Sequence, residues 1–163
     1  MISKIIELWE GEAARECMKD GYMPKLTTYV LAGEKKRGAV LILPGGSYRY
    51  TSPREAEPVA LQFNAAGFHA FVLDYRVAPS RYPKPLLDAS KAMCIIRENA
   101  DNWKIDSGKI AVCGFSAGGH LAASLGVHWQ KDYLKSVPGV SEGLNRPDAL
   151  ILCYPVISPE YSL

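Results

Sequence analysis

The sequence has little that would place it outside the ordinary globular proteins. No apolar run among its 163 residues approaches the roughly 20 residues that a membrane-spanning helix needs. The formal net charge is only +2 and no basic stripe is interleaved with aromatic side chains, so we expect no nucleic-acid partner. The first residues include the acid Glu7 and lack the apolar core of a secretory signal. The sequence therefore predicts a cytoplasmic protein without a membrane segment.

Cysteine and histidine are also scarce, and their spacing does not suggest a metal site. Cys17, Cys94, Cys113 and Cys153 are far apart and form no CxxC pair. No cluster of cysteine and histidine has the spacing of zinc ligands, so no metal is expected. Because Cys113 and Cys153 lie inside apolar runs, the pattern predicts reduced, buried thiols.

The residues that are present alternate between strand-like and helix-like segments. Hydrophobic residues make up 48% of the chain and charged residues 22%, and we expect one domain over residues 1–163. The alternation predicts an α/β fold, a three-layer sandwich around a mostly parallel sheet. Strands are expected at residues 5–9, 26–31, 38–43, 69–75, 109–114 and 148–155, helices at 52–66, 86–100 and 117–130, and a polar connector at 131–147.

The segment Gly114-Phe115-Ser116-Ala117-Gly118 follows one of these strands and opens a helix. A G-x-S-x-G pentapeptide in that setting is typical of a nucleophile elbow, a sharp turn that raises the serine hydroxyl above the sheet. Side chains at Gly114 and Gly118 would crowd such a turn. The start of the helix would offer backbone N–H groups to a developing oxyanion. The alternative is a serine that only caps a helix.

A second glycine-rich segment, Pro44-Gly45-Gly46-Ser47-Tyr48, ends the strand at residues 38–43. Carboxyl ends of parallel strands meet at one edge of a sheet, so we expect this segment to face Ser116. Its glycines would let backbone N–H groups point inward at an oxyanion. The alternative is an ordinary loop after a strand.

Four short segments occur in a fixed order along the chain. They are Pro44-Gly45-Gly46-Ser47-Tyr48, Arg54-Glu55-Ala56-Glu57-Pro58-Val59-Ala60, Leu73-Asp74-Tyr75-Arg76-Val77-Ala78-Pro79 and Gly114-Phe115-Ser116-Ala117-Gly118-Gly119-His120-Leu121-Ala122. In this order they resemble the α/β-hydrolase superfamily, in its esterase/lipase branch near the hormone-sensitive-lipase-like and acetyl-esterase (acetylxylan-esterase-like) enzymes. The resemblance runs from about residue 38 to residue 163 and also fits the two opening strands.

The resemblance implies a serine hydrolase of small-molecule carboxylic esters, with small acyl groups such as acetyl and no cofactor. Ser116 would be the nucleophile, and the amides of Gly46, Ser47 and Ala117 would form the oxyanion hole. Gly45 and Tyr48 would line the substrate pocket. The alternative for Tyr48 is that its ring only packs against neighbouring side chains.

The chain departs from the resembling family at two positions of this loop. Many relatives have a histidine at the position of Pro44 and a third glycine at that of Ser47. Because of these differences, it stays open which N–H groups of the loop donate to the oxyanion. Asp74, Tyr75, Arg76 and Asp88 also match family positions and are interpreted as structural. Arg76 is expected to pair with a carboxylate.

A serine nucleophile needs a base, and none of the three histidines is a convincing one. His69 begins its strand and so lies at the opposite edge of the sheet from Ser116. His128 is twelve residues beyond Ser116, about 18 Å along a helix that rises ~1.5 Å per residue. His120 is one turn from Ser116 but lies on the helix flank, and the resembling family does not use the histidine found there as the base.

The sequence likewise offers no convincing acid, because Asp148 begins its strand and Glu160 has no histidine to orient. The resemblance implies that the domain over residues 1–163 is incomplete and lacks the last strands of the hydrolase sheet. Three explanations remain open: a truncated esterase, a short form completed by a second copy or another chain, and a non-catalytic binding domain on this scaffold. A thioesterase or a peptidase of the same fold would share the elbow. The strand around residues 150–154 would lie at the sheet edge with uncovered apolar faces, which predicts pairing with another copy of the chain.

Overall fold

The structure, a computed structural model, describes residues 1–158 as an alternation of strands and helices. Its elements are β1 (Ile2–Glu7), α1 (Gly11–Lys19), β2 (Lys25–Val30), β3 (Arg37–Leu43), the 3₁₀ turn η1 (Pro53–Glu55), α2 (Glu57–Ala65), β4 (His69–Asp74), α3 (Lys84–Glu98), β5 (Ile105–Phe115), α4 (Ala117–His128), α5 (Asp132–Lys135) and β6 (Ala149–Cys153).

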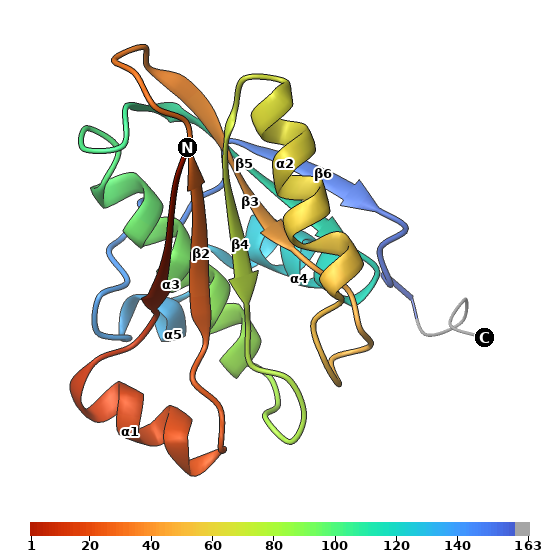
Figure 1. Ribbon diagram of the computed structural model, residues 1–163. Coiled ribbons are helices and arrows are strands. Elements are labelled where there is room, and N and C mark those ends of the chain that lie inside the picture. Colours follow the sequence, from red (N-terminus) through yellow and green to blue (C-terminus); the bar gives the residue numbers. More distant parts are fainter. Residues whose placement is uncertain (159–163) are drawn as a thin grey trace.

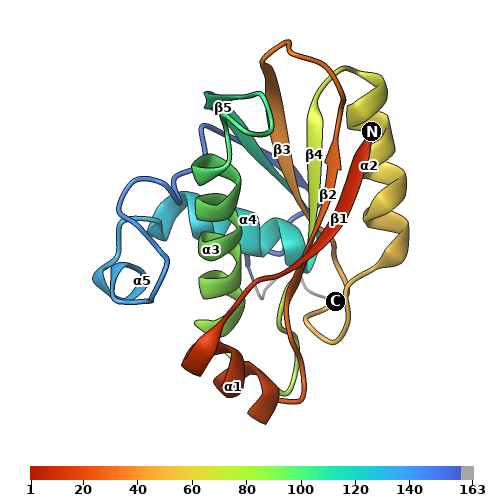
Figure 2. The same ribbon diagram turned by 60° about the vertical axis from the view of Figure 1, so that its left-hand side comes forward.

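The six strands form one sheet in the order β1-β2-β4-β3-β5-β6. Strands β4, β3, β5 and β6 run parallel, and β1 and β2 add antiparallel pairs at the other edge. Helix α2 covers one face, and α3 and α4 cover the opposite face (Figures 1 and 2). The predicted three-layer α/β sandwich with a mostly parallel sheet is confirmed.

Alternate side chains of the central strands fill the two cores. In β3, Leu41 and Leu43 belong to the core beneath α3 and α4, and Val40 and Ile42 belong to the smaller core beneath α2. All four are at most 3% exposed. Helices on both faces explain why β3 is an uninterrupted apolar run, because neither face meets water.

The helix expected to begin at Ser52 begins five residues later, so this prediction is wrong. Residues Pro53–Glu55 form only a 3₁₀ turn, the side chain of Ser52 makes no capping bond, and α2 starts at Glu57. Pro58 explains the break, because proline has no N–H to donate to the preceding turn and is tolerated only in the first turn of a helix.

Helix α1 was not predicted, and β1 starts and ends earlier than expected. Gly11–Lys19 has no capping side chain at Glu10, and Cys17 is its only fully buried residue. The sequence therefore lacks both the usual start signal and a broad apolar stripe. Leu8 and Trp9, expected in the strand, lie beyond β1 and are buried in the larger core. Strand β5 begins earlier than expected, and the connector contains the short helix α5.

Strand β6 forms an edge of the described sheet, as predicted. Leu150, Ile151 and Leu152 are each about 40% exposed. The edge position also corrects the interpretation of Cys153, which is only partly buried, whereas the other three free cysteines are fully buried. Pairing of this edge with a second copy stays a prediction. Within residues 1–158, the helices are too short or too polar to cross a membrane.

A buried ion pair lies beneath the segment that follows β4. The guanidinium of Arg76 donates to both carboxylate oxygens of Asp88, with an Nη2–Oδ1 distance of 2.8 Å, and the indole N–H of Trp9 donates to the same carboxylate at 2.7 Å. Asp88 is fully buried and Arg76 nearly so. The expected pairing of Arg76 with a carboxylate is confirmed, and it ties α3 to the segment beyond β4.

His69 is fully buried at the amino end of β4. Its Nδ1 accepts from the N–H of Leu31 at 3.1 Å, so the neutral ring carries its proton on Nε2 and donates it to the carbonyl of Lys104 at 3.2 Å. Burial lowers the pKa of His69 from its ordinary value of 6.5. The histidine expected at the far edge of the sheet is therefore a structural residue.

We expect Asp88→Asn to lower the free energy of unfolding by about 3–5 kcal/mol, because the charge of Arg76 would stay buried without its partner. The matched control is Asp101→Asn, which removes a carboxylate from the exposed Lys36–Asp101 pair and should cost no more than about 1 kcal/mol. Urea unfolding measures both values. Equal losses in the two variants would contradict a structural role for the buried pair.

We expect the free energy of unfolding to fall as the pH is lowered through 6.5, the ordinary pKa of histidine. Below that pH the unfolded chain takes up a proton that folded His69 does not, so acid favours unfolding until the pH reaches the lower pKa of the folded state. Urea titrations at several pH values should show this slope in the natural chain. The slope should be shallower in His69→Gln, and an identical profile would refute the assignment.

Candidate active site

Ser116 lies at a sharp turn between the end of β5 and the start of α4. Its backbone has φ 51° and ψ −114°, a conformation that a non-glycine residue rarely adopts. A Cβ on Gly114 would collide with the carbonyl of Gly118, and one on Gly118 would collide with the carbonyl of Leu43. The two glycines of the pentapeptide are therefore required sterically, as the sequence predicted.

Hydrogen bonds on both sides hold the strained turn. The N–H of Ser116 donates to the carbonyl of Cys153 at 3.0 Å, and its carbonyl accepts from Val156 at 3.3 Å and from His120 at 3.0 Å. Ala117 is the first residue of α4, so its N–H has no partner within the helix. Among the described residues, that N–H donates to no other protein group and lies beside the serine.

The loop at residues 44–48 packs directly against the serine. A Cβ on Gly45 would lie 3.1 Å from the Cβ of Ser116. Gly46, Ser47 and Tyr48 follow with φ values of 134°, 54° and 55°, which turn the chain tightly. In the described part of the chain, the N–H groups of Gly46 and Ser47 donate to no other protein group. Two segments more than 60 residues apart thus bring unpaired N–H donors to one place.

A cavity of about 460 Å³ opens between this loop and the elbow. Ser47, Tyr48, Ser116 and Ala117, all singled out from the sequence, line it, whereas Gly45 and Gly46 are not among its lining residues. The other described residues that line it are His120, Val156, Ile157 and Ser158.

The structure places His120 in the lining of the Ser116 cavity, but one of its ring nitrogens is engaged by another side chain. The Nδ1 atom of His120 shares a hydrogen bond of 2.7 Å with the hydroxyl of Tyr48. His69 lies at the opposite end of the sheet, and His128 is the last residue of α4. Among residues 1–158, no side chain forms a hydrogen bond with the hydroxyl of Ser116.

The two acids considered from the sequence do not complete a triad either. The carboxylate of Asp148 accepts from the N–H of Ile110 at 2.9 Å and pairs with Arg97, at the amino end of β6. Glu160 lies outside the described residues. No three His, Cys, Asp or Glu side chains of residues 1–158 gather closely enough to hold a metal ion.

Glu55 was given no chemical role from the sequence, yet it supports the glycine loop. One of its carboxylate oxygens accepts from the N–H of Gly45 at 2.7 Å, and the other accepts from the hydroxyl of Tyr154 at 2.8 Å. The hydroxyl of Tyr75 donates to the carbonyl of Pro44 at 2.5 Å on the other side. The only signal in the sequence was that Glu55 falls in a segment shared with the resembling family.

Comparison with known proteins identifies the family. A model of the alpha/beta hydrolase fold matches residues 40–162. The chain belongs to the α/β-hydrolase family. It is similar to an acetyl ester-xyloside bifunctional hydrolase from Caldicellulosiruptor lactoaceticus, with 40% identity and a TM-score of 0.86 over 97% of this chain and 59% of that structure.

Curated relatives are similar over most of this chain but are much longer. Endo-1,4-beta-xylanase B of Butyrivibrio fibrisolvens is 38% identical over 93% of this chain and 24% of its own length. Acetylxylan esterase of Xylanibacter ruminicola is 31% identical over 74% of this chain and 23% of its own length. This α/β-hydrolase chain thus spans about a quarter of these relatives and about 60% of the similar solved structure.

We expect Glu55→Ala to speed the hydrogen exchange of the Gly45 amide by at least about tenfold, because a hydrogen bond to a charged acceptor contributes roughly 1.5–3 kcal/mol. Glu55→Gln keeps an acceptor oxygen and should give a smaller change. The matched control is Glu57→Ala, two residues along and exposed. Exchange that is unaffected by Glu55→Ala would contradict a supporting role.

Proposed function

We propose that this chain carries the nucleophile and the oxyanion-binding groups of a serine carboxylic-ester hydrolase. The observation that supports the proposal best is the meeting of Ser116 with Ser47 of the glycine loop and with Ala117 around one cavity. Such donors stabilise the charge that develops when an ester carbonyl is attacked.

In the proposed reaction the hydroxyl oxygen of Ser116 attacks the carbonyl carbon of the ester. The carbonyl electrons move onto oxygen, and the amides of Gly46, Ser47 and Ala117 bind that oxyanion together with the positive end of α4. Collapse of the intermediate breaks the bond to the alcohol, which leaves with a proton. Water then attacks the acyl-serine, and the acid is released while Ser116 regains its hydrogen.

The proton of Ser116 needs an acceptor that residues 1–158 do not supply in this geometry. We therefore propose that the base, and the acid that orients it, come from outside these residues, from the same polypeptide or from another chain. The share of the relatives' length that this chain covers supports the proposal. Without a base, backbone donors and binding alone can still give a residual ~10³–10⁴-fold acceleration over water.

The substrate that we propose is a small acyl ester, such as an acetyl group on a sugar hydroxyl. Two similar proteins support this choice by their names, the acetyl ester-xyloside hydrolase and the acetylxylan esterase. A non-catalytic binding domain is the second candidate, and it is favoured because residues 1–158 place no base in hydrogen-bond contact with Ser116. The two candidates differ in whether Ser116 reacts.

We expect a fluorophosphonate probe to label the chain slowly and only at Ser116, because the elbow exposes the hydroxyl beside the donors while no base accelerates the attack. Mass spectrometry of the digested chain locates the label. Ser116→Ala should abolish labelling, and Ser136→Ala, which changes an exposed serine after α5, should not affect it. Equal labelling of Ser116→Ala, or a natural chain that never reacts, would favour the binding domain.

A further inference from the structure

A second cavity lies beside the first, on the far side of one pair of side chains. It has a volume of about 270 Å³ and lies between α4 and the segment that runs from β4 into α3. Tyr48 and His120 are the two residues common to the described linings of both cavities. This pair therefore forms the wall between the Ser116 cavity and the second cavity.

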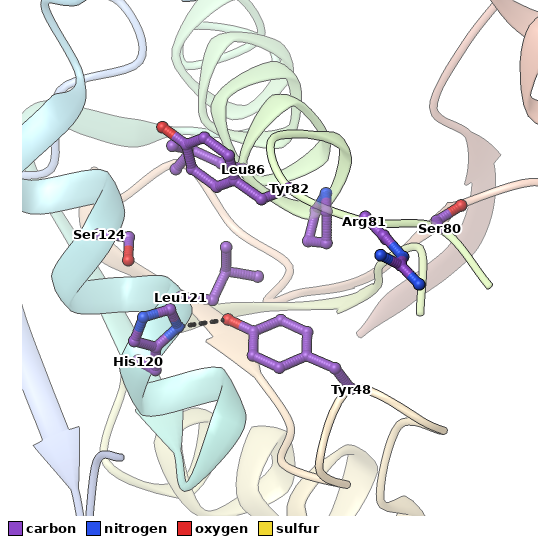
Figure 3. Close-up of a pocket in the computed structure, with 9 residues that line it drawn as sticks. Tyr48, Ser80, Arg81, Tyr82, Leu86, His120, Leu121 and Ser124 are labelled. Carbon is purple, nitrogen blue, oxygen red and sulfur yellow. Dashed lines mark hydrogen bonds between the residues drawn. The ribbon is translucent and has the colours of Figure 1, made fainter. Parts of the chain in front are cut away.

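The wall is held in place from both sides. The hydroxyl of Tyr48 and Nδ1 of His120 are joined by a hydrogen bond of 2.7 Å, and their rings meet edge to face at 5.8 Å (Figure 3). The carbonyl of Tyr48 accepts from the N–H of Ala78 at 2.7 Å, and its ring also packs against Tyr75. His120 is fixed on α4, one turn beyond Ser116. The pair is a positioned barrier between the nucleophile and the second cavity.

The second cavity is chemically suited to an alkyl chain. Leu86, Leu121 and Pro85 contribute carbon atoms to its lining. Figure 3 shows Leu121 next to the Tyr48–His120 pair, whereas Ser80 and Arg81 lie on the side away from His120. A chain entering past the wall would therefore meet apolar groups first. Burial of each methylene contributes roughly 0.8 kcal/mol, which is about fourfold in affinity.

We propose that the Tyr48–His120 pair sets the length of the acyl group that Ser116 accepts, and that the second cavity is an alkyl subsite closed by this pair. Closed, the wall confines the acyl group to the Ser116 cavity. Opened, it joins the two cavities and admits a longer straight chain. This inference rests on the proposed ester hydrolase function and adds its selectivity to it.

The first experiment compares acylation by 4-nitrophenyl acetate and 4-nitrophenyl hexanoate, followed by release of 4-nitrophenolate. We expect Tyr48→Ala to raise the hexanoate-to-acetate rate ratio at least tenfold, since several methylenes would become buried. His120→Ala removes the other side chain of the wall and should raise the same ratio. Because His120 is exposed on a helix, this variant should fold.

Two further variants test where the longer chain goes. Ser124→Phe, introduced into the Tyr48→Ala chain, places a ring in the second cavity and should return the ratio toward that of the natural chain. Tyr50→Ala removes a 58% exposed aromatic side chain from the neighbouring loop and should leave the ratio unchanged. A ratio that Tyr48→Ala does not alter, or a gain that survives Ser124→Phe, would overturn the proposal. If His120→Ala abolished the reaction with both esters, His120 would be assigned as the base, and this result would also overturn the proposal.

A second experiment does not depend on any reaction at Ser116. Calorimetric titration with hexanoate should show at least tenfold tighter binding to Tyr48→Ala than to the natural chain, and Ser124→Phe should reverse this gain. Equal affinities would overturn the alkyl subsite even if Ser116 proves reactive. A gain in hexanoate affinity with an unreactive Ser116 would support the subsite while the hydrolase function fails.

Discussion

The site depends on one steric constraint, the close approach of backbone to backbone at the elbow. Because Gly114 and Gly118 have no side chains, α4 can begin directly against the end of β3. That approach lifts Ser116 out of the sheet beside the loop that follows Leu43. The conformation of Ser116 costs about 1–3 kcal/mol. It persists because Cys153, at the end of β6, accepts from the N–H of the serine, and Val156, beyond β6, donates to its carbonyl.

The glycine loop is held by groups that do not enter the cavity. Glu55 binds it through the N–H of Gly45, and Tyr75 binds it through the carbonyl of Pro44. Glu55 in turn holds Tyr154, so the loop and the segment after β6 are joined through one carboxylate. Donors fixed in this way need little reorganisation when charge develops on a substrate. The same rigidity makes the neighbouring Tyr48 ring effective as a wall.

Much of the fold could be predicted from the sequence because its signals are local. The apolar runs of the parallel strands and the helical spacing of α3 and α4 are read within single segments, and right-handed connections then determine the layers. The two wrong helix predictions also had local causes. Ser52 looked like a helix cap, but Pro58 delays the start of α2. Helix α1 is short, has no capping side chain at its start and fully buries only Cys17, so no start signal or long apolar run marked it.

The turn at Ser116 and the glycine loop could be inferred from short stretches of sequence, because a tight turn requires glycine at neighbouring positions. The surroundings of these two segments depend on contacts between distant parts of the chain. The contact of Glu55 with Tyr154 spans 99 residues, and that of Tyr48 with His120 spans 72. No periodicity or motif encodes such pairs, since they form only when the sheet brings loops from different strands to one edge. The separation of the two cavities is therefore a property of the folded chain.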